Sequence, residues 1–381
     1  TGIYKRGSGD IGFVSNSTEI VNIDGNGLTV TSKDATINSI SIGKGANSVA
    51  GNTVLGESAL DASVSGGENT AIGKTALTTN TSGANNTAVG MEALKLNTTG
   101  SENTSVGRQS LKNNTTGSNN VAVGRNTLPN NTTASNNTGV GYNALNQNTT
   151  GFQNVAVGSN ALDANTTGDR NIGIGHSALG ANTTANNNIG IGDNALQVNT
   201  TGEQNVAVGS LALDANTTGN YNNAVGYFSL TSNTTGSKNI AVGMSTLESN
   251  TTADNNTAVG HNSLLLNTTG ASNTAVGSLA LDANTTGNFN DAFGKSSLSA
   301  NTTGGSNVAI GSGALNANTT ASYNTAVGAS ALNDNTTGNK NVAVGAFALD
   351  ANTSGLFNTA VGYDCLTTSN GSYNVGIGGN C

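Results

Sequence analysis

Few side chains in this sequence combine a reactive type with a suggestive spacing, and the two cysteines are the clearest case. Cys365 and Cys381 each follow a glycine, Gly362 and Gly378, by three residues in two successive copies of a repeat. Each replaces the small residue that most other copies carry there. If the copies stack, the two Cα atoms approach the separation of about 4.4–6.8 Å that a disulfide requires. The pattern is compatible with a disulfide that locks the last copy, and also with two buried thiols.

The ionisable side chains do not gather into a pattern typical of catalysis or metal binding. His176 and His261 occupy the same position of the repeat but lie five copies apart. That distance is roughly 24 Å at strand spacing, so they cannot share a metal ion on one chain, and we expect both on the surface. The carboxylates are scattered, and the motifs HExxH, GxSxG and the phosphate-binding loop do not occur. We therefore expect no enzyme activity and no cofactor.

These side chains lie within a repeat of 17 residues, whose fold determines their positions. Nineteen glycines follow one another at this interval from Gly56 to Gly362. We number each copy from position 1, an Asn such as Asn86. Position 3 is small, position 4 is mostly Val or Ile, position 5 is Gly, position 9 is Leu, and position 12 is Asn in most copies, followed by Thr-Thr-Gly. A fixed period of this length is typical of solenoids.

Two regions follow from the extent of the repeat. We predict an N-terminal β-hairpin adaptor over residues 1–50, because alternating apolar and polar residues flank a turn at Asp24–Gly27. We predict a solenoid shaft over residues 51–381.

The predicted fold is all-β: a parallel β-solenoid or β-roll of about 20 coils, one coil for each repeat. We expect two short strands per coil, around Val-Gly and Ala-Leu, with Gly at positions 5 and 15 in turns of positive φ. Stacking brings identical residues about 4.8 Å apart, so Leu and Val columns should fill the core and Asn columns should hydrogen-bond between coils. The predicted structural core includes Leu94, Leu145, Leu213, Leu281, Val89, Val157, Asn86, Asn97, Asn154 and Asn165.

The order of small and large residues predicts that several chains associate. In both expected strands a small residue stands beside a large one, as in strands that are buried on two sides. One face would pack on its own coil, and the small face would approach another chain. We therefore predict a fibrous homotrimer. The alternative is a monomeric solenoid whose Ala residues turn inward.

Composition narrows the range of partners. The net charge is −8, with 13 basic and 21 acidic residues, whereas nucleic-acid binding requires a basic surface. We therefore expect no nucleic-acid partner. No apolar run reaches the length of about 18 residues that a membrane span needs, so we expect no span. The chain begins at Thr1 without Met, and we expect a processed product or a fragment.

Aromatic residues recur at two places in the repeat. Some, such as Phe289 and Tyr323, directly precede a leading Asn, and others follow the Gly of position 5. Exposed rings offer flat apolar surfaces on which sugars stack, and local packing over the turns is the alternative. The candidate glycan-contact residues are Tyr221, Tyr227, Phe228, Phe347, Phe357, Tyr363 and Tyr373.

The Asn-Thr-Thr segments suggest a further alternative. Stacked Thr pairs can form a flat array of hydroxyl groups of the kind that ice-binding solenoids display. Adjacent residues of a strand point to opposite faces, which argues against two neighbouring Thr columns on one surface.

The repeat unit also resembles known repeats. Asn154–Gly158 (NVAVG) and Asn307–Gly311 (NVAIG) are similar to the head repeats of trimeric autotransporter adhesins, which are left-handed parallel β-rolls. This chain differs in its longer period, its second-strand Leu and its Asn-Thr-Thr-Gly turn. Phe13–Leu28 (FVSNSTEIVNIDGNGL) together with the arrays resembles bacteriophage tail-fibre proteins still more. That resemblance implies a homotrimeric fibre whose tip contacts host-surface glycans.

The expected function is that of a structural fibre shaft in a phage tail, which projects an adhesive tip and takes part in host attachment. Its expected location is the virion. Expected partners are two further copies, other tail or baseplate proteins at the N-terminal end, and a host-surface glycan or protein at the tip. The alternatives are a trimeric adhesin on a bacterial cell surface and, less favoured, a monomeric ice-binding solenoid.

Overall fold

The computed structural model describes residues 2–6, 10–15, 18–24, 27–30, 34–62 and 64–381. These residues form strands and turns, with one 3₁₀ segment, η1 (Ala46–Ser48), and no α-helix. The chain divides into two units, residues 1–154 and 155–381. Coils with the 17-residue spacing recur in both units, about 19 in all, so the predicted parallel β-solenoid is confirmed. In the described part of the chain, no helix has the length and apolar character that a membrane crossing requires.

The first strands of unit 1 form an antiparallel sheet in the order β1-β2-β3-β4. Strands β3 and β4 pair, with Asp24 opposite Gly27. The two central residues of the expected turn, 25 and 26, lie outside the described residues. Strands β5, β6 and β7 also pair antiparallel, and the ladder becomes parallel from β7 to β8. The bounds are β1 (Gly2–Arg6), β2 (Asp10–Ser15), β3 (Thr18–Asp24), β4 (Gly27–Val30), β5 (Ala35–Ile37) and β6 (Ile40–Gly43).

The coils of unit 1 contribute one short strand each, and identical positions pair in register. Ala88, for example, stands between Ala71 on the preceding coil and Ser105 on the following coil. These strands are β7 (Thr53–Gly56), β8 (Thr70–Ile72), β9 (Thr87–Val89), β10 (Thr104–Val106), β11 (Val121–Val123) and β12 (Thr138–Val140).

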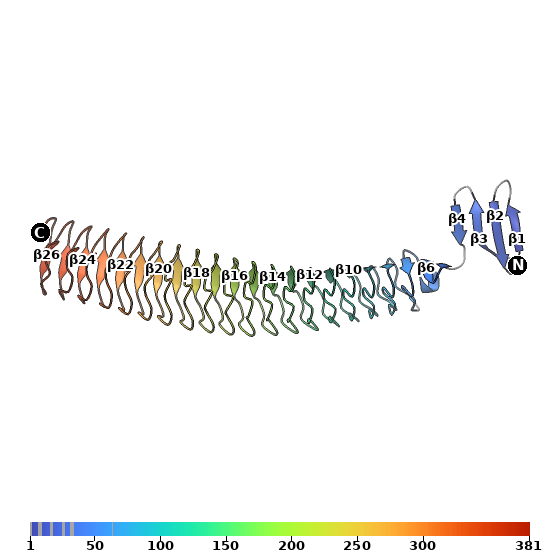
Figure 1. Ribbon diagram of the computed structural model, residues 1–381, viewed down its shortest axis with the longest axis horizontal. Helices are drawn as coiled ribbons and strands as arrows, with labels where there is room; N and C mark the ends of the chain where they lie inside the picture. Colours follow the sequence, from blue (N-terminus) through green and yellow to red (C-terminus); the bar gives the residue numbers. More distant parts are fainter. Residues whose placement is uncertain (1, 7–9, 16–17, 25–26, 31–33, 63) are drawn as a thin grey trace. The chain divides into compact units, whose positions relative to one another are not determined.

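Unit 2 repeats the same parallel pairing from β13 to β26, and Figure 1 shows these strands as a row of neighbouring arrows. They are β13 (Val155–Val157), β14 (Ile172–Ile174), β15 (Ile189–Ile191), β16 (Val206–Val208), β17 (Asn223–Val225), β18 (Ile240–Val242), β19 (Thr257–Val259), β20 (Thr274–Val276), β21 (Asp291–Phe293), β22 (Val308–Ile310), β23 (Thr325–Val327), β24 (Val342–Val344), β25 (Thr359–Val361) and β26 (Val375–Ile377).

Each strand presents only its middle residue to the interior. Ala88 and Ala156, at position 3, are fully buried, whereas the flanking side chains at positions 2 and 4 face outward. The expectation that the Val column fills the core is therefore wrong: Val89 is half-buried and Val157 is 37% exposed. The physical reason is the two-residue period of a strand, which sends positions 2 and 4 to the same face.

The second strand that we expected around Ala-Leu is absent from the described coils. The segment is a series of turns, and its Leu adopts a left-handed conformation, with φ of 47° at Leu94 and 52° at Leu213. Extended strands require negative φ, so this segment is not a strand. Its backbone still bonds between coils, as Leu213 N–H does to the Ser229 carbonyl at 3.1 Å. The Leu side chain nevertheless points inward.

The interior is closed within one chain. Position 3 and position 9 both face it, as the fully buried Ala207 and Leu213 illustrate. The prediction that the small residues approach a second chain is therefore wrong, because a strand of three residues turns its central Ala toward its own coil. The other predicted core residues that are fully buried are Leu94, Leu145, Leu281, Asn86, Asn97, Asn154 and Asn165.

Two columns of buried Asn line this interior. The Asn97 side-chain amide donates to Oδ1 of Asn80 on the preceding coil at 2.9 Å and to the Gly100 carbonyl at 2.8 Å. The Asn86 amide donates to Oδ1 of Asn69 at 3.1 Å and to the same Gly100 carbonyl at 2.9 Å. The carbonyl at position 15 thus joins the two columns, and buried amides obtain the partners that burial requires.

Glycine has different roles at positions 5 and 15. Gly90 at position 5 has φ of 138°, and a Cβ there would lie 2.5 Å from the Gly107 carbonyl oxygen on the next coil. The prediction of positive φ at position 15 is wrong, because Gly100 does not have a positive φ. In other coils Ala134 and Ala185 occupy position 15, and both are buried.

Candidate functional site

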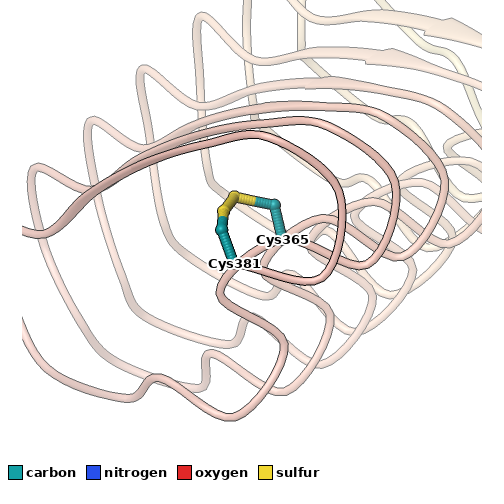
Figure 2. Close-up of a disulfide and its surroundings, with 2 residues drawn as sticks. All are labelled: Cys365 and Cys381. Atoms are coloured by element: carbon teal, nitrogen blue, oxygen red, sulfur yellow. A yellow bond between two sulfur atoms is a disulfide. The ribbon is translucent and has the colours of Figure 1, made fainter.

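The two cysteines form a disulfide at the end of unit 2. Cys365 is fully buried, its Cα lies 4.7 Å from that of Cys381, and Figure 2 shows the bond between the last two coils. The final coil is held further by backbone bonds from Leu366 N–H to the Cys381 carbonyl and from Asn380 N–H to the Tyr363 carbonyl, both 2.9 Å. Of the alternatives left open by the sequence, the structure has the disulfide.

The two histidines lie on the surface. Nδ1 of His176 is 3.2 Å from Oδ1 of Asp193 on the next coil, and the His176 side chain is 59% exposed. His261 is also exposed. Within the described ranges, no three His, Cys, Asp or Glu side chains come together as metal ligands would.

One carboxylate joins two coils of unit 1. Glu92 accepts a hydrogen bond of 2.8 Å from Gln109 and forms ion pairs of 2.9 Å with Lys95 and 3.0 Å with Lys112. The Gln109 hydrogen bond, followed by those of the two lysines, lowers the pKa of Glu92 from its ordinary value of 4.5 to about 2. The cluster is a bridge between coils, because Gln109 and Lys112 belong to the coil that follows the coil of Glu92 and Lys95.

The candidate glycan-contact aromatics fall on two lines that flank the strands. Tyr227, Phe228, Phe347 and Tyr363 stand at positions 6 and 7, just after the strand. The ring centroids of Phe347 and Tyr363 lie 6.0 Å apart in an edge-to-face contact, and those of Tyr227 and Phe228 lie 4.1 Å apart at an interplanar angle of 57°. These are contacts between neighbouring rings.

The other line consists of position 17, directly before the leading Asn. Tyr221, Phe357 and Tyr373 belong to it, and the rings of Phe357 and Tyr373 stack at 5.1 Å with an interplanar angle of 6°. We call the segment from Phe289 to Tyr373 of this line the aromatic edge. Tyr323 is 63% exposed and Tyr373 is 74% exposed, so the rings are not covered by the turns of their own chain.

The aromatic edge contains a cation that the sequence analysis did not select. Nζ of Lys340 lies 4.9 Å from the ring centroid of Phe357, on the coil between Tyr323 and Phe357. Such a contact is attractive because the ring face carries negative charge. Lys340 stands at position 17, as Phe357 does, and this shared position is visible in the sequence. It indicates a contact between the two side chains only when the coils are known to stack in register.

Two shallow hollows lie along the aromatic edge. The first, about 240 Å³, lies between Phe289 and Tyr323, and the second, about 330 Å³, lies between Tyr323 and Phe357. Both include Ser322, and the second includes Lys340. Ring, hollow, ring, hollow and ring therefore alternate along one side of unit 2.

In the Asn-Thr-Thr segments, the hydroxyl group of the first Thr donates a hydrogen bond to a backbone carbonyl of the next coil. Thr217 Oγ1 donates to the Thr234 carbonyl on the next coil at 3.0 Å, and Thr234 Oγ1 donates likewise to Thr251 at 3.1 Å. Thr218, the second residue of its pair, is exposed. The two Thr columns thus have different environments, and they do not form one uniform hydroxyl surface.

In comparisons with protein-family models, curated proteins and solved structures, nothing matched the chain. The chain's own residues therefore provide the evidence for its function. Its two candidate surfaces are the outward face of the strands and the aromatic edge.

Proposed function

We propose that the chain is the structural shaft of a homotrimeric fibre, a phage tail fibre that takes part in host attachment. The observation that carries the proposal is the outward face of the strands in unit 2. Position 4 there is Val or Ile in every strand except β21, where it is Phe293. Val225 is 40% exposed and Val242 is 38% exposed, so a continuous column of apolar side chains faces solvent in one chain.

The chemistry of this face favours a second copy as its partner. Position 2 contributes a parallel column that is Val, Ile or Thr except for Asn223 and Asp291, and Asp291 is the one charged residue at positions 2 and 4 of β13–β26. Extended apolar surfaces of this kind are typical of interaction sites. A second copy of the chain has the same distance between its coils. Its apolar residues at positions 2 and 4 therefore recur at the same intervals as those of the first copy and can face them coil by coil.

The resemblance to phage fibres and trimeric adhesins supports three as the number of copies. A shaft function agrees with the repeat itself, because a solenoid lengthens by addition of coils without a change of local structure. The closed interior means that each chain can fold its own coils, and association then covers the strand face.

The mass of the particle in solution tests the proposal. Multi-angle light scattering during size-exclusion chromatography should give three times the chain mass for the unmodified protein. Val225→Glu combined with Val242→Glu should lower that mass, because two charges would be buried in the contact. The matched control is Thr235→Glu with Thr252→Glu, two exposed residues at position 14, which should keep the trimer.

A chain that stays monomeric at all concentrations would contradict the proposal, and thermal hysteresis in that monomer would support the ice-binding alternative. Immunogold labelling of phage particles that encode the chain should place it on the tail. Labelling of a bacterial surface in cells that carry no phage would instead support the adhesin.

A further inference from the structure

We infer that the aromatic edge binds a linear glycan whose sugar chain runs parallel to the row of coils in unit 2. The inference goes beyond the shaft function, because it assigns a ligand to the shaft itself. It rests on the alternation of rings and hollows at position 17 and not on the strand face.

The spacing of the rings is regular. Phe289, Tyr323 and Phe357 are separated by two coils each, or about 9.6 Å at strand spacing. The coils between them carry Ser306 and Lys340 at the same position. This distance is on the order of the length of two sugar rings, so a linear glycan can place every second sugar against an aromatic ring.

The backbone at position 17 has a positive φ, which is unfavourable for aromatic residues. Phe289, Tyr323 and Phe357 have φ of 58°, 61° and 56°. Left-handed conformations are tolerated best by Gly and Asn, and bulky residues adopt them at a cost. Asn187 and Asn255 occupy the same position in other coils of unit 2. Aromatic rings here thus oppose local preference. Phe289 and Tyr323 are 65% and 63% exposed, so burial in this chain does not compensate for them, whereas the Phe357 ring packs on Tyr373 and contacts Lys340.

The surroundings of the rings have the mixed chemistry that suits sugars. The first hollow is lined by Asn288, Thr303 and Ser322, whose amide and hydroxyl groups exchange hydrogen bonds with sugar hydroxyls. The second adds Asn339 and the exposed Lys340, whose ammonium group has three donors. Ring faces offer stacking surfaces for the apolar faces of sugars.

The edge is also held rigid before any ligand arrives. Tyr323 N–H donates to the Gly305 carbonyl at 3.1 Å and Phe357 N–H to the Asn339 carbonyl at 3.2 Å, each on the preceding coil. Asn339 Oδ1 accepts from Ser322 N–H at 2.6 Å. Rings on a fixed ladder lose little freedom on binding, which favours affinity.

The experiment probes the full chain, in whatever assembly it forms, with an array of linear oligosaccharides that contains neutral and acidic chains of two to eight sugars. We expect binding of at least one linear chain, and we expect octasaccharides to bind more tightly than disaccharides because they reach more than one ring. Tyr323→Ala combined with Phe357→Ala should weaken that binding by on the order of tenfold or more. Lys340→Ala should weaken it less.

The control is Tyr227→Ala combined with Tyr363→Ala, two exposed tyrosines on the opposite side of the strands, which should bind within about twofold of the unmodified chain. Circular dichroism and thermal unfolding verify that each variant keeps its fold. Absence of glycan binding, or equal loss in the control, overturns the inference. So does a lower particle mass in Tyr323→Ala with Phe357→Ala, since the edge would then be a contact between copies.

Discussion

The side-chain amide of Asn233 donates a hydrogen bond of 2.9 Å to Oδ1 of Asn216, which stands at the same position on the preceding coil. The same amide donates to the Gly236 carbonyl at 2.9 Å, and Oδ1 of Asn233 accepts from Asn250 on the following coil at 2.9 Å. All three Asn are fully buried. Each amide is therefore a link in a directional chain, in which donors point to the preceding coil and acceptors to the following one.

We predict that Asn233→Asp destabilises the solenoid by about 3 kcal/mol or more near neutral pH. A carboxylate oxygen would replace the amide donor and face two acceptors in a buried site. Burial raises the pKa of such a carboxyl, and the protonated form can restore one donor, so the defect should shrink as pH falls. Thermal unfolding at pH 4 and pH 8 measures both effects. Asn255→Asp, at an exposed position, is the control and should show no comparable loss.

The sequence was sufficient to predict the solenoid and its Asn and Leu columns, because each recurs without a slip in register. It was not sufficient to predict which way Val157 faces. In the triplet Val-Ala-Val both flanks are apolar, so the pattern lacks the polar residues that normally mark the outer face of a strand. The buried Ala156 was consequently assigned to a contact between chains.

Two other features could not be predicted from the sequence, for physical reasons. Leu213 has φ of 52°, a conformation that local preference disfavours for Leu, so only the packing of whole coils can impose it. The contact of Lys340 with Phe357 joins neighbouring coils and depends on register. In the sequence, a variable position with an occasional lysine is typical of an ordinary solvated surface.

Glycine at position 5 should be far less replaceable than glycine at position 15. Gly209 has φ of 141°, and a Cβ there would lie 2.4 Å from the Gly226 carbonyl oxygen. We expect Gly209→Ala to cost about 2 kcal/mol or more in unfolding free energy. A Cβ at Gly219 would also lie close to a carbonyl oxygen, 2.3 Å from that of Gly236, but Gly219 lacks the positive φ. Ala185 and Ala253 already occupy its position elsewhere in unit 2, so the coils can adjust to a Cβ there and Gly219→Ala should cost less. Chemical denaturation of the pair measures the difference, and equal losses would contradict the assigned roles.

The Glu92 bridge should give acid sensitivity in a defined range. Because folding lowers the pKa of Glu92 from 4.5 to about 2, its stabilisation is fully present above pH 4.5 and is lost as pH falls toward 2. Glu92→Gln should therefore lower the melting temperature at pH 6 and make little difference near pH 2. Calorimetry between pH 2 and pH 6 measures the difference in melting temperature. Glu102→Gln, at an exposed position, is the control; a Glu92→Gln deficit that does not diminish with acid would contradict the assignment.

The disulfide should act as a local clamp on the last coil. Strand β26 pairs with β25 on one side, and its Val375 and Ile377 are 73% and 76% exposed, so this coil lacks the neighbour that stabilises coils further inside unit 2. A crosslink that closes a loop of this size contributes about 3 kcal/mol, which is comparable to what one terminal coil needs to stay closed. We therefore expect reduction to speed hydrogen exchange in β26 and leave β20 unchanged, as measured by mass spectrometry. Cys365→Ala combined with Cys381→Ala should exchange rapidly in β26 with or without reductant. If β26 stayed protected after reduction, the hydrogen bonds of Leu366 and Asn380 would be holding the coil without help from the disulfide.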